Sequence, residues 1–142
     1  MTTDVSDLVR RHFNTHDTFA RHLDIEVVEV KPGYAKAVMP LETPQKNGVG
    51  LAHGGAIFGL ADIAFGGACC SSGEVALGVV SSINYLSAGK KGPLTAEAKE
   101  LRRSRKLGHY EVLVFDGDGA LMAVCRATAY FRGDLFPGMP SG

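Results

Sequence analysis

Asp62 is the only charged residue between Gly54 and Gly73, in a segment otherwise rich in apolar residues, glycine and alanine. If this segment is helical, Asp62 lies one turn from both Phe58 and Phe65, and its neighbours on that face are apolar. An ionised carboxylate in such surroundings is costly unless it is paired or its face opens into a site that uses raised basicity. The pattern therefore indicates a catalytic base or nucleophile, or else a buried aspartate bonded to a backbone amide or to a basic side chain from another strand.

Two glycines at the start of this segment favour a site for an anion or an oxyanion. The sequence His53-Gly54-Gly55 stands where the helix would begin, and a helix start carries unpaired N–H groups and a partial positive charge. Because these glycines have no side chains, a ligand oxygen can approach the backbone closely. Asn47, in the loop just upstream, is placed to reach such a ligand. The alternatives are a flexible entry turn and, for Asn47, an ordinary turn residue before glycine.

Basic residues gather at two expected turns in the second half of the chain. They are Lys90, Lys91, Arg102, Arg103, Arg105 and Lys106. Such clusters bind the phosphates of nucleotide-like ligands, although solvated turns have the same composition. The five histidines form no ligand cluster and the three cysteines do not repeat at zinc-ligand spacing, so neither a metal nor another cofactor is expected.

The order of the hydrophobic patterns predicts an α+β fold. Residues 4–20 have helical spacing, and two strands follow within 25–39 around a Lys-Pro-Gly turn. A polar loop over 41–52 leads into the apolar helix, at about 54–71. Alternating segments bounded by turn residues then predict antiparallel strands over 76–86, 94–103, 109–115 and 121–131. A sheet that curls around the apolar helix would bury it.

The length and charge of the chain set further bounds. We expect its 142 residues to form one domain over 1–142, with a helical extension over 1–24 and a frayed tail over 132–142. Lys+Arg and Asp+Glu both number 15, so no overall charge attracts nucleic acid or an acidic membrane. The N-terminus lacks the pattern of a signal peptide, and a carboxylate at the centre of the apolar segment argues against a membrane span. With the odd cysteine count, these features favour a cytoplasmic protein.

The stretch from Asn47 to Phe65 resembles the signature of the PaaI-type hotdog thioesterases, a family named for phenylacetate degradation. In that family an Asn is followed six residues later by His-Gly-Gly and then by an apolar helix containing Leu-Ala-Asp-x-Ala. Here these features are Asn47, His53-Gly54-Gly55 and Leu60-Ala61-Asp62-Ile63-Ala64, in the same order and at the same spacing. The resemblance covers about residues 47–131.

This resemblance implies a hotdog fold, in which an antiparallel sheet wraps around one central helix. It also implies a homotetramer, built as a dimer of dimers, with active sites at a subunit interface. The implied reaction is hydrolysis of an acyl-coenzyme A thioester to the free acid and coenzyme A, and the coenzyme is part of the substrate.

The resemblance also implies roles for individual residues. Asp62 would attack the thioester or activate water, and the Gly54 N–H would polarise the thioester carbonyl. Asn47, beside His53 of the partner subunit, would position the reacting groups, and Arg105 would lie near the coenzyme A nucleotide. From the residues themselves, we expect further substrate contacts at Gly55, Phe58, Phe65, Tyr85 and Lys106.

One position departs from the family pattern, and two other functions stay open. Some family members carry a Ser or Thr that holds the hydrolytic water on the strand after the helix, where this chain has Gly78, and Ser81 and Ser82 are out of step with that position. The alternatives to hydrolysis are a non-catalytic acyl-CoA-binding module and a hotdog hydratase or dehydratase. The latter would need a His base beside the carboxylate, and His53 stands at the wrong end of the helix.

Overall fold

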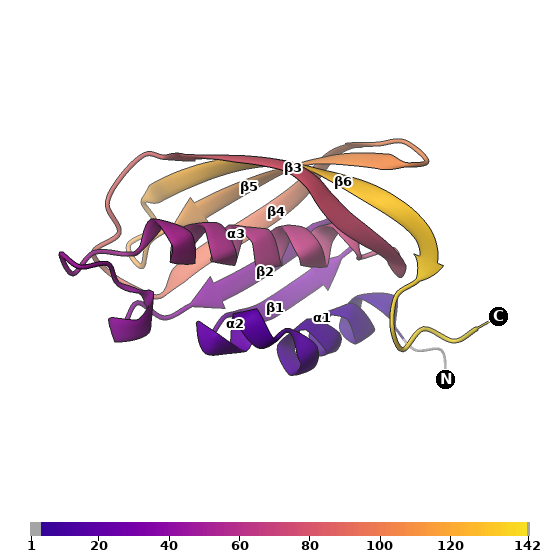
Figure 1. Cartoon of the computed structure of the whole chain (residues 1–142), viewed down its shortest axis with the longest axis horizontal. Helices are drawn as coiled ribbons and strands as arrows, with labels where there is room; N and C mark the ends of the chain where they lie inside the picture. Colours follow the sequence, from indigo (N-terminus) through magenta and orange to yellow (C-terminus); the bar gives the residue numbers. More distant parts are fainter. Residues whose placement is uncertain (1–3, 142) are drawn as a thin grey trace.

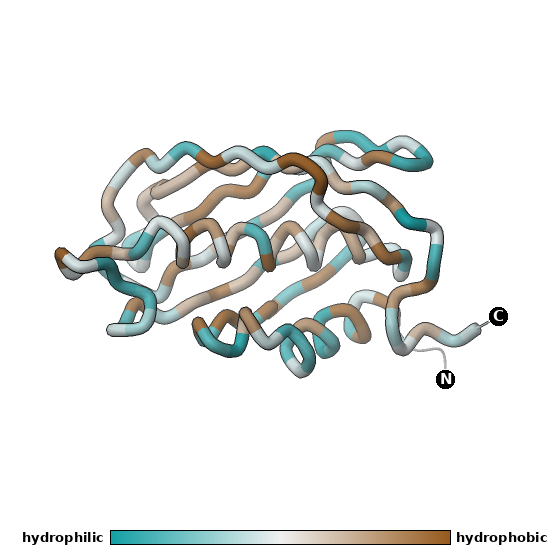
Figure 2. Tube along the Cα trace, viewed as in Figure 1, coloured by the Kyte–Doolittle hydropathy of each residue, from teal (hydrophilic) through white to brown (hydrophobic). Residues whose placement is uncertain are grey.

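The long apolar helix α3, Gly54–Cys69, forms the centre of the computed structural model, which describes residues 4–141 (Figure 1). Its sequence has almost no polar face, and Figure 2 colours it white and brown over most of its length. A helix of this kind must be covered on most sides to leave water. Eleven of its sixteen residues are buried, Leu60, Ala61 and Ala64 completely.

A six-stranded antiparallel sheet supplies that cover. The strands are β1 (Glu26–Lys31), β2 (Tyr34–Met39), β3 (Glu74–Tyr85), β4 (Leu94–Arg103), β5 (Leu107–Phe115) and β6 (Leu121–Leu135). Their order across the sheet is β1-β2-β4-β5-β6-β3, so β1 and β3 are its two edges. Figure 1 shows the sheet curving around α3, with β3 and β6 bending over its far end. The predicted α+β hotdog architecture is confirmed.

Small side chains let the sheet approach the helix closely. Four of the six buried positions of β2 and β4 are alanines, Ala35, Ala37, Ala96 and Ala98, all completely buried. At the closest point a Cβ on Gly67 of α3 would lie only 2.9 Å from the Cβ of Ala35. Larger residues there would push the sheet away from α3 and open the core.

The N-terminal segment differs from the single helix expected over 4–20. It forms α1 (Val5–His16) and α2 (Thr18–His22), separated at Asp17, whose backbone is extended with φ −80° and ψ 99°. The break is stabilised because the Asp17 carboxylate accepts a hydrogen bond from the Ala20 N–H at 2.9 Å, which caps α2. The local capping bond outweighs the continuous helical spacing of the apolar residues.

The C-terminal segment expected to fray over 132–142 is instead paired as a strand as far as Leu135 and anchored at Phe136, while most of its other residues are exposed. Strand β6 continues to Leu135, because its pairing with β3 extends to Glu74. Phe136 is buried, and its N–H donates to the Gly73 carbonyl at 2.7 Å. Gly142 and residues 1–3 lie outside the described residues. Within residues 4–141, no helix has the length and apolar content that crossing a membrane requires.

Candidate active site

Asp62 opens into a cavity of about 480 Å³ beside α3. The floor of the cavity comes from α3 itself, and its walls come from α1, from the start of β3 and from the C-terminal segment. Wall residues include Phe13 of α1, Leu77 of β3 and Phe136 after β6. A carboxylate therefore stands among mostly apolar side chains in a space large enough for a small organic group.

The Asp62 carboxylate has no recorded hydrogen bond or ion pair with any other residue of the described chain. Its side chain remains accessible to solvent, but the cavity walls remove much of its hydration. This desolvation, with a smaller contribution from the negative charge of Asp17, raises the pKa of the Asp62 carboxyl above its usual range. Asp62 is thus a stronger base than an exposed aspartate, and it lacks the partner that a structural aspartate would need.

The start of α3 is capped by the side chain of His53. Its Nδ1 accepts a hydrogen bond from the Gly55 N–H at 2.8 Å, and its carbonyl accepts from the N–H groups of Ala56 and Ile57. Within the described residues, the Gly54 N–H has no recorded acceptor. Of the two predicted glycine donors, Gly54 therefore keeps an N–H for a ligand, whereas the Gly55 N–H is already bonded.

Tyr85 and Asn47 lie at the same end of α3 and line a second cavity of about 360 Å³. The Tyr85 hydroxyl donates to the Gly54 carbonyl at 2.9 Å. The Asn47 side-chain oxygen accepts from the N–H groups of Val49 and Leu51, each at 3.0 Å, so it shapes its own loop. This leaves the Asn47 amide NH₂ as the group that could contact a ligand.

Asp62 and Gly54 do not meet within one chain. They are eight residues apart on α3, which corresponds to about 12 Å along the helix axis. A thioester carbonyl is far smaller than this separation. The structure therefore brings Asn47, His53, Gly54 and Tyr85 together at the start of α3. Asp62 lies in a separate cavity at the middle of the helix.

The two predicted phenylalanines take different positions. Phe65 is buried, packs edge-on against Tyr110 with ring centroids 5.4 Å apart, and lines the Asp62 cavity. Phe58 is half-buried against the core and lines neither the Asp62 cavity nor the second one. Gly78 also lines the Asp62 cavity, and a Cβ there would lie 3.0 Å from the Phe65 ring. A serine at this position would therefore require the Phe65 ring to move by a few tenths of an ångström.

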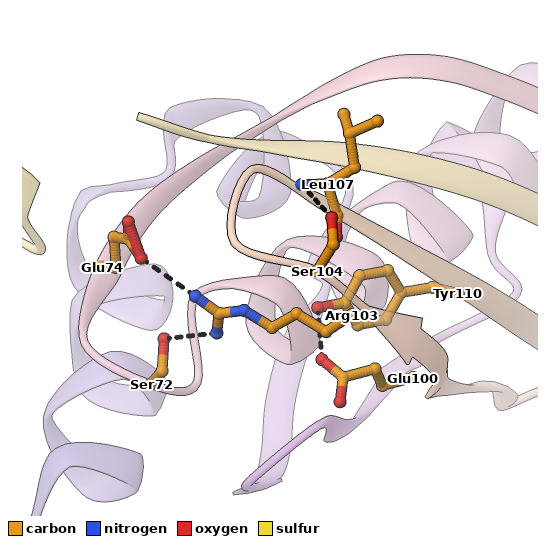
Figure 3. A network of polar contacts seen from close by, with 7 residues as sticks. All are labelled: Ser72, Glu74, Glu100, Arg103, Ser104, Leu107 and Tyr110. Atoms are coloured by element: carbon orange, nitrogen blue, oxygen red, sulfur yellow. Dashed lines mark hydrogen bonds and ion pairs between the residues drawn. The ribbon is translucent and has the colours of Figure 1, made fainter. Parts of the chain in front are cut away.

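In the basic cluster at the end of β4, Arg103 is bonded to residues of the chain, whereas Arg105 and Lys106 have no ion pair within residues 4–141. The Arg103 guanidinium donates to Ser72 and Glu74 at 3.2 and 3.0 Å (Figure 3). It also lies 3.6 Å from the Phe131 ring centroid. Arg105 is exposed in the β4–β5 turn, beyond the C-terminal end of α3 (Figure 1). The Lys106 ammonium lies 5.6 Å from the Tyr130 ring centroid. Neither Arg105 nor Lys106 lines the Asp62 cavity.

Several residues of the cavity were missed by the sequence analysis. They lie on α1 and in the C-terminal segment and include His12, Phe13, His16, Arg132 and Phe136. The available signal was a pair of glycines, Gly59 and Gly66, on the same face of α3 as Asp62. Within residues 4–141, no group of three or more His, Cys, Asp or Glu side chains is arranged to hold a metal ion.

Comparison with known proteins supports these features. Residues 49–123 match the model of the family described as the thioesterase superfamily. The acyl-coenzyme A thioesterase PaaI of Escherichia coli is 30% identical over 124 residues, covering 87% of this chain and 89% of the relative. A protein of Archaeoglobus fulgidus, whose name assigns it provisionally to the esterases, is 36% identical over 130 residues, covering 91% and 84%.

Solved structures agree with the sequence comparison. The structure of E. coli PaaI, from the phenylacetic acid degradation operon, superposes with a TM-score of 0.88 at 27% identity, covering 93% of this chain and 96% of its own. A thioesterase protein from Streptococcus pneumoniae, solved with coenzyme A, superposes with a TM-score of 0.73 at 27% identity, covering 78% and 90%.

The unpaired state of Asp62 leads to a prediction about stability. Because the folded chain raises the pKa of Asp62, its ionised form is disfavoured in the fold. The resulting free-energy cost to the folded state is absent below the pKa that Asp62 has in the unfolded chain. It is complete above the raised pKa that Asp62 has in the folded chain. Replacement Asp62→Asn should therefore raise the Tm at about pH 7.5, and the difference should shrink towards about pH 4.

Thermal melts of both proteins across this pH range test the prediction, with Glu26→Gln as a control at an exposed carboxylate on β1. If Asp62→Asn instead lowered the Tm at neutral pH, Asp62 would be a structural partner and not an unpaired base.

Proposed function

Since the chain belongs to the thioesterase superfamily, and within it to the PaaI-type hotdog thioesterases, it is a thioester hydrolase, and we propose that its substrates are acyl-coenzyme A thioesters. The observation that carries this proposal is the unpaired, desolvated carboxylate of Asp62 at the Asp position of the family signature. The coenzyme A in the S. pneumoniae structure supports the choice of coenzyme A as the thiol.

Asp62 supplies the base or the nucleophile of the reaction. As a base, it takes a proton from water, whose oxygen adds to the thioester carbonyl carbon; the C–S bond then breaks and coenzyme A leaves as the thiol. As a nucleophile, its carboxylate oxygen adds to the carbonyl carbon and the C–S bond breaks, which gives a mixed anhydride and the coenzyme A thiolate; water then hydrolyses the anhydride to the free acid and restores Asp62. In both cases negative charge develops on the carbonyl oxygen. The Gly54 N–H, reinforced by the positive end of the α3 dipole, is the donor suited to stabilise it.

Two chains must combine to bring these groups to one thioester, because about 12 Å separates them in one chain. The edge strand β3 offers the means. Its outward residues are apolar and exposed, Leu77 by 51%, Val79 by 56% and Val80 by 65%, and an unpaired strand edge accepts another strand.

The position of the two-fold axis decides what such pairing brings together. Antiparallel pairing of two β3 strands around an axis at Val80 sets Tyr85 of the partner subunit opposite Val75. Val75 lines the Asp62 cavity, and Tyr85 bonds to Gly54. The pairing thus carries the Gly54 end of one α3 towards Asp62 of the other chain, and Asn47 and His53 move with it.

The acyl group and the coenzyme A part of the substrate require different surroundings. The cavity beside Asp62 has aromatic and aliphatic walls, which suit the acyl group. The phosphates of coenzyme A need positive charge near the mouth of the site, and Arg105 and Lys106 are our candidates. Three rings of the cavity, Phe13, Phe65 and Phe136, would surround the acyl group. The two alternative functions differ in product, since neither an acyl-CoA-binding module nor a hydratase releases free thiol.

Replacement of Asp62 by Asn tests the catalytic role. The amide keeps the shape of the side chain but loses its charge, so kcat should fall by roughly 10²–10⁴, the usual contribution of a general base. Affinity for a non-hydrolysable acyl-CoA analogue should change little. Thiol release measures kcat, and Asp118→Asn in the β5–β6 turn is the control. A folded Asp62→Asn protein with full turnover would rule out the mechanism.

Replacement Arg105→Ala should raise KM for acyl-CoA esters by roughly two- to tenfold and leave kcat nearly unchanged. A phosphate contact remote from the thioester binds the ground state and the transition state equally. Steady-state kinetics measure both constants. Arg126→Ala is the control, because Arg126 is paired with Glu111 on the outside of the sheet. An unchanged KM would remove Arg105 from the site.

The shared site predicts that assembly and activity are lost together. We expect a homo-oligomer, specifically a homotetramer in which two dimers associate. In Val80→Lys, two like charges would face each other at the axis, so light scattering should give a smaller mass and thiol release should nearly stop. Leu101→Lys is the control, because Leu101 is also an exposed apolar residue, at 53% against 65% for Val80. A monomeric, active wild-type protein would contradict the shared site.

A further inference from the structure

Two glycines flank Asp62 on the same face of α3, and each is covered by a phenylalanine of the N-terminal segment. Gly59 precedes Asp62 by three residues and Gly66 follows it by four, the spacings that place residues side by side on a helix. A Cβ on Gly59 would lie 2.8 Å from the Phe19 ring, and a Cβ on Gly66 would lie 3.0 Å from the Phe13 ring. Both rings therefore rest directly on the helix backbone, one on each side of Asp62.

The two rings differ in what lies around them. Phe13 lines the Asp62 cavity and is supported from behind by Phe136, whose ring is stacked with it at 6.1 Å between centroids. Phe19 is 53% exposed and does not line the cavity. Of these two rings, only Phe13 therefore limits the space next to the Asp62 carboxylate.

Hydrogen bonds and packing fix the position of the part of the Asp62 cavity wall that Phe13 forms. The adjacent Asn14 donates its amide N–H to the Val27 carbonyl at 2.9 Å and accepts the Val27 N–H at 2.8 Å. This pair of bonds joins α1 to the edge strand β1 at its bulge. Val9, one turn earlier on α1, is completely buried. With its helix anchored and Phe136 behind it, the Phe13 ring cannot move aside freely for a larger ligand.

We propose that Phe13, seated on Gly66, is a specificity-determining residue that sets the largest acyl group able to lie beside Asp62. The inference rests on the proposed thioesterase function. It assigns substrate selection to the N-terminal helix α1, which lies outside the sequence signature. Gly66 contributes by its missing side chain, because any Cβ there would displace the ring.

The test compares Phe13→Ala with Phe19→Ala on straight-chain acyl-CoAs from butanoyl to hexadecanoyl. Phe13→Ala should raise the ratio of kcat/KM for the long esters over the short ones by roughly 10- to 200-fold, the range that one hydrophobic pocket contact discriminates. Phe19→Ala removes the same ring from the other side of Asp62 and should leave the ratio unchanged. Should Phe13→Ala fold poorly, Phe13→Leu should shift the ratio in the same direction by less.

A second measurement tests the contact between the Phe13 ring and Gly66. Gly66→Ala should lower the Tm in the wild-type background, since the new methyl group meets the Phe13 ring. In the Phe13→Ala background the same change should be neutral or stabilising, because alanine is the better helix residue.

The outcomes separate this inference from the proposed function. If the wild-type protein hydrolyses acyl-CoAs but Phe13→Ala and Phe13→Leu keep its chain-length ratio, the inference is overturned and the function stands. A shift of equal size in Phe19→Ala would also overturn it. If the wild-type protein releases thiol from no acyl-CoA, the function and the inference both fail.

Discussion

The structure depends on enclosing α3, a helix that is apolar on nearly every side and carries one carboxylate in its middle. The hydrophobic effect requires the sheet to close around the helix, and the alanines of β2 and β4 let it come close. The same enclosure would be very unfavourable for an ionised aspartate. The compromise is a cavity on the one side that the sheet leaves uncovered, where Asp62 keeps contact with solvent and lacks a partner. The raised pKa of the Asp62 carboxyl is thus a direct consequence of how the core is buried.

Glycine determines how the N-terminal and C-terminal segments join this core. Gly59 and Gly66 let Phe19 and Phe13 reach the backbone of α3, and Gly78 leaves room for the ring of Phe65. Segments far apart in sequence therefore meet around Asp62. The end of the chain takes part as well, because Phe136 backs Phe13. The site is assembled from aromatic rings placed where the helix and the sheet have no side chains.

Helix geometry also explains why Asp62 and the Gly54 N–H stand apart in a single chain. The Gly54 N–H is available only because it is the first residue of α3, and Asp62 is desolvated only because it is in the middle. The two requirements cannot be met at one point on one helix. Within our proposal a second copy resolves the conflict, since the exposed apolar edge of β3 would bring the start of its helix to the first chain's carboxylate.

The sequence by itself determined the architecture and, through its resemblance to the family signature, the choice of Asp62 as the candidate catalytic residue. The change from helical spacing to alternation, together with the spacing of Asn47, His53-Gly54-Gly55 and Asp62, was sufficient because both patterns are local and repeat at fixed intervals. It did not determine the walls of the site. The break at Asp17 depends on one capping bond. The order of the C-terminal segment depends on the pairing of β6 with β3 as far as Leu135, a contact between residues far apart in the sequence. The pairing of Arg103 likewise depends on Ser72 and Glu74, about thirty residues away. Only the tertiary structure determines which rings surround Asp62, because the space that a glycine leaves empty is filled by a side chain from a distant part of the chain.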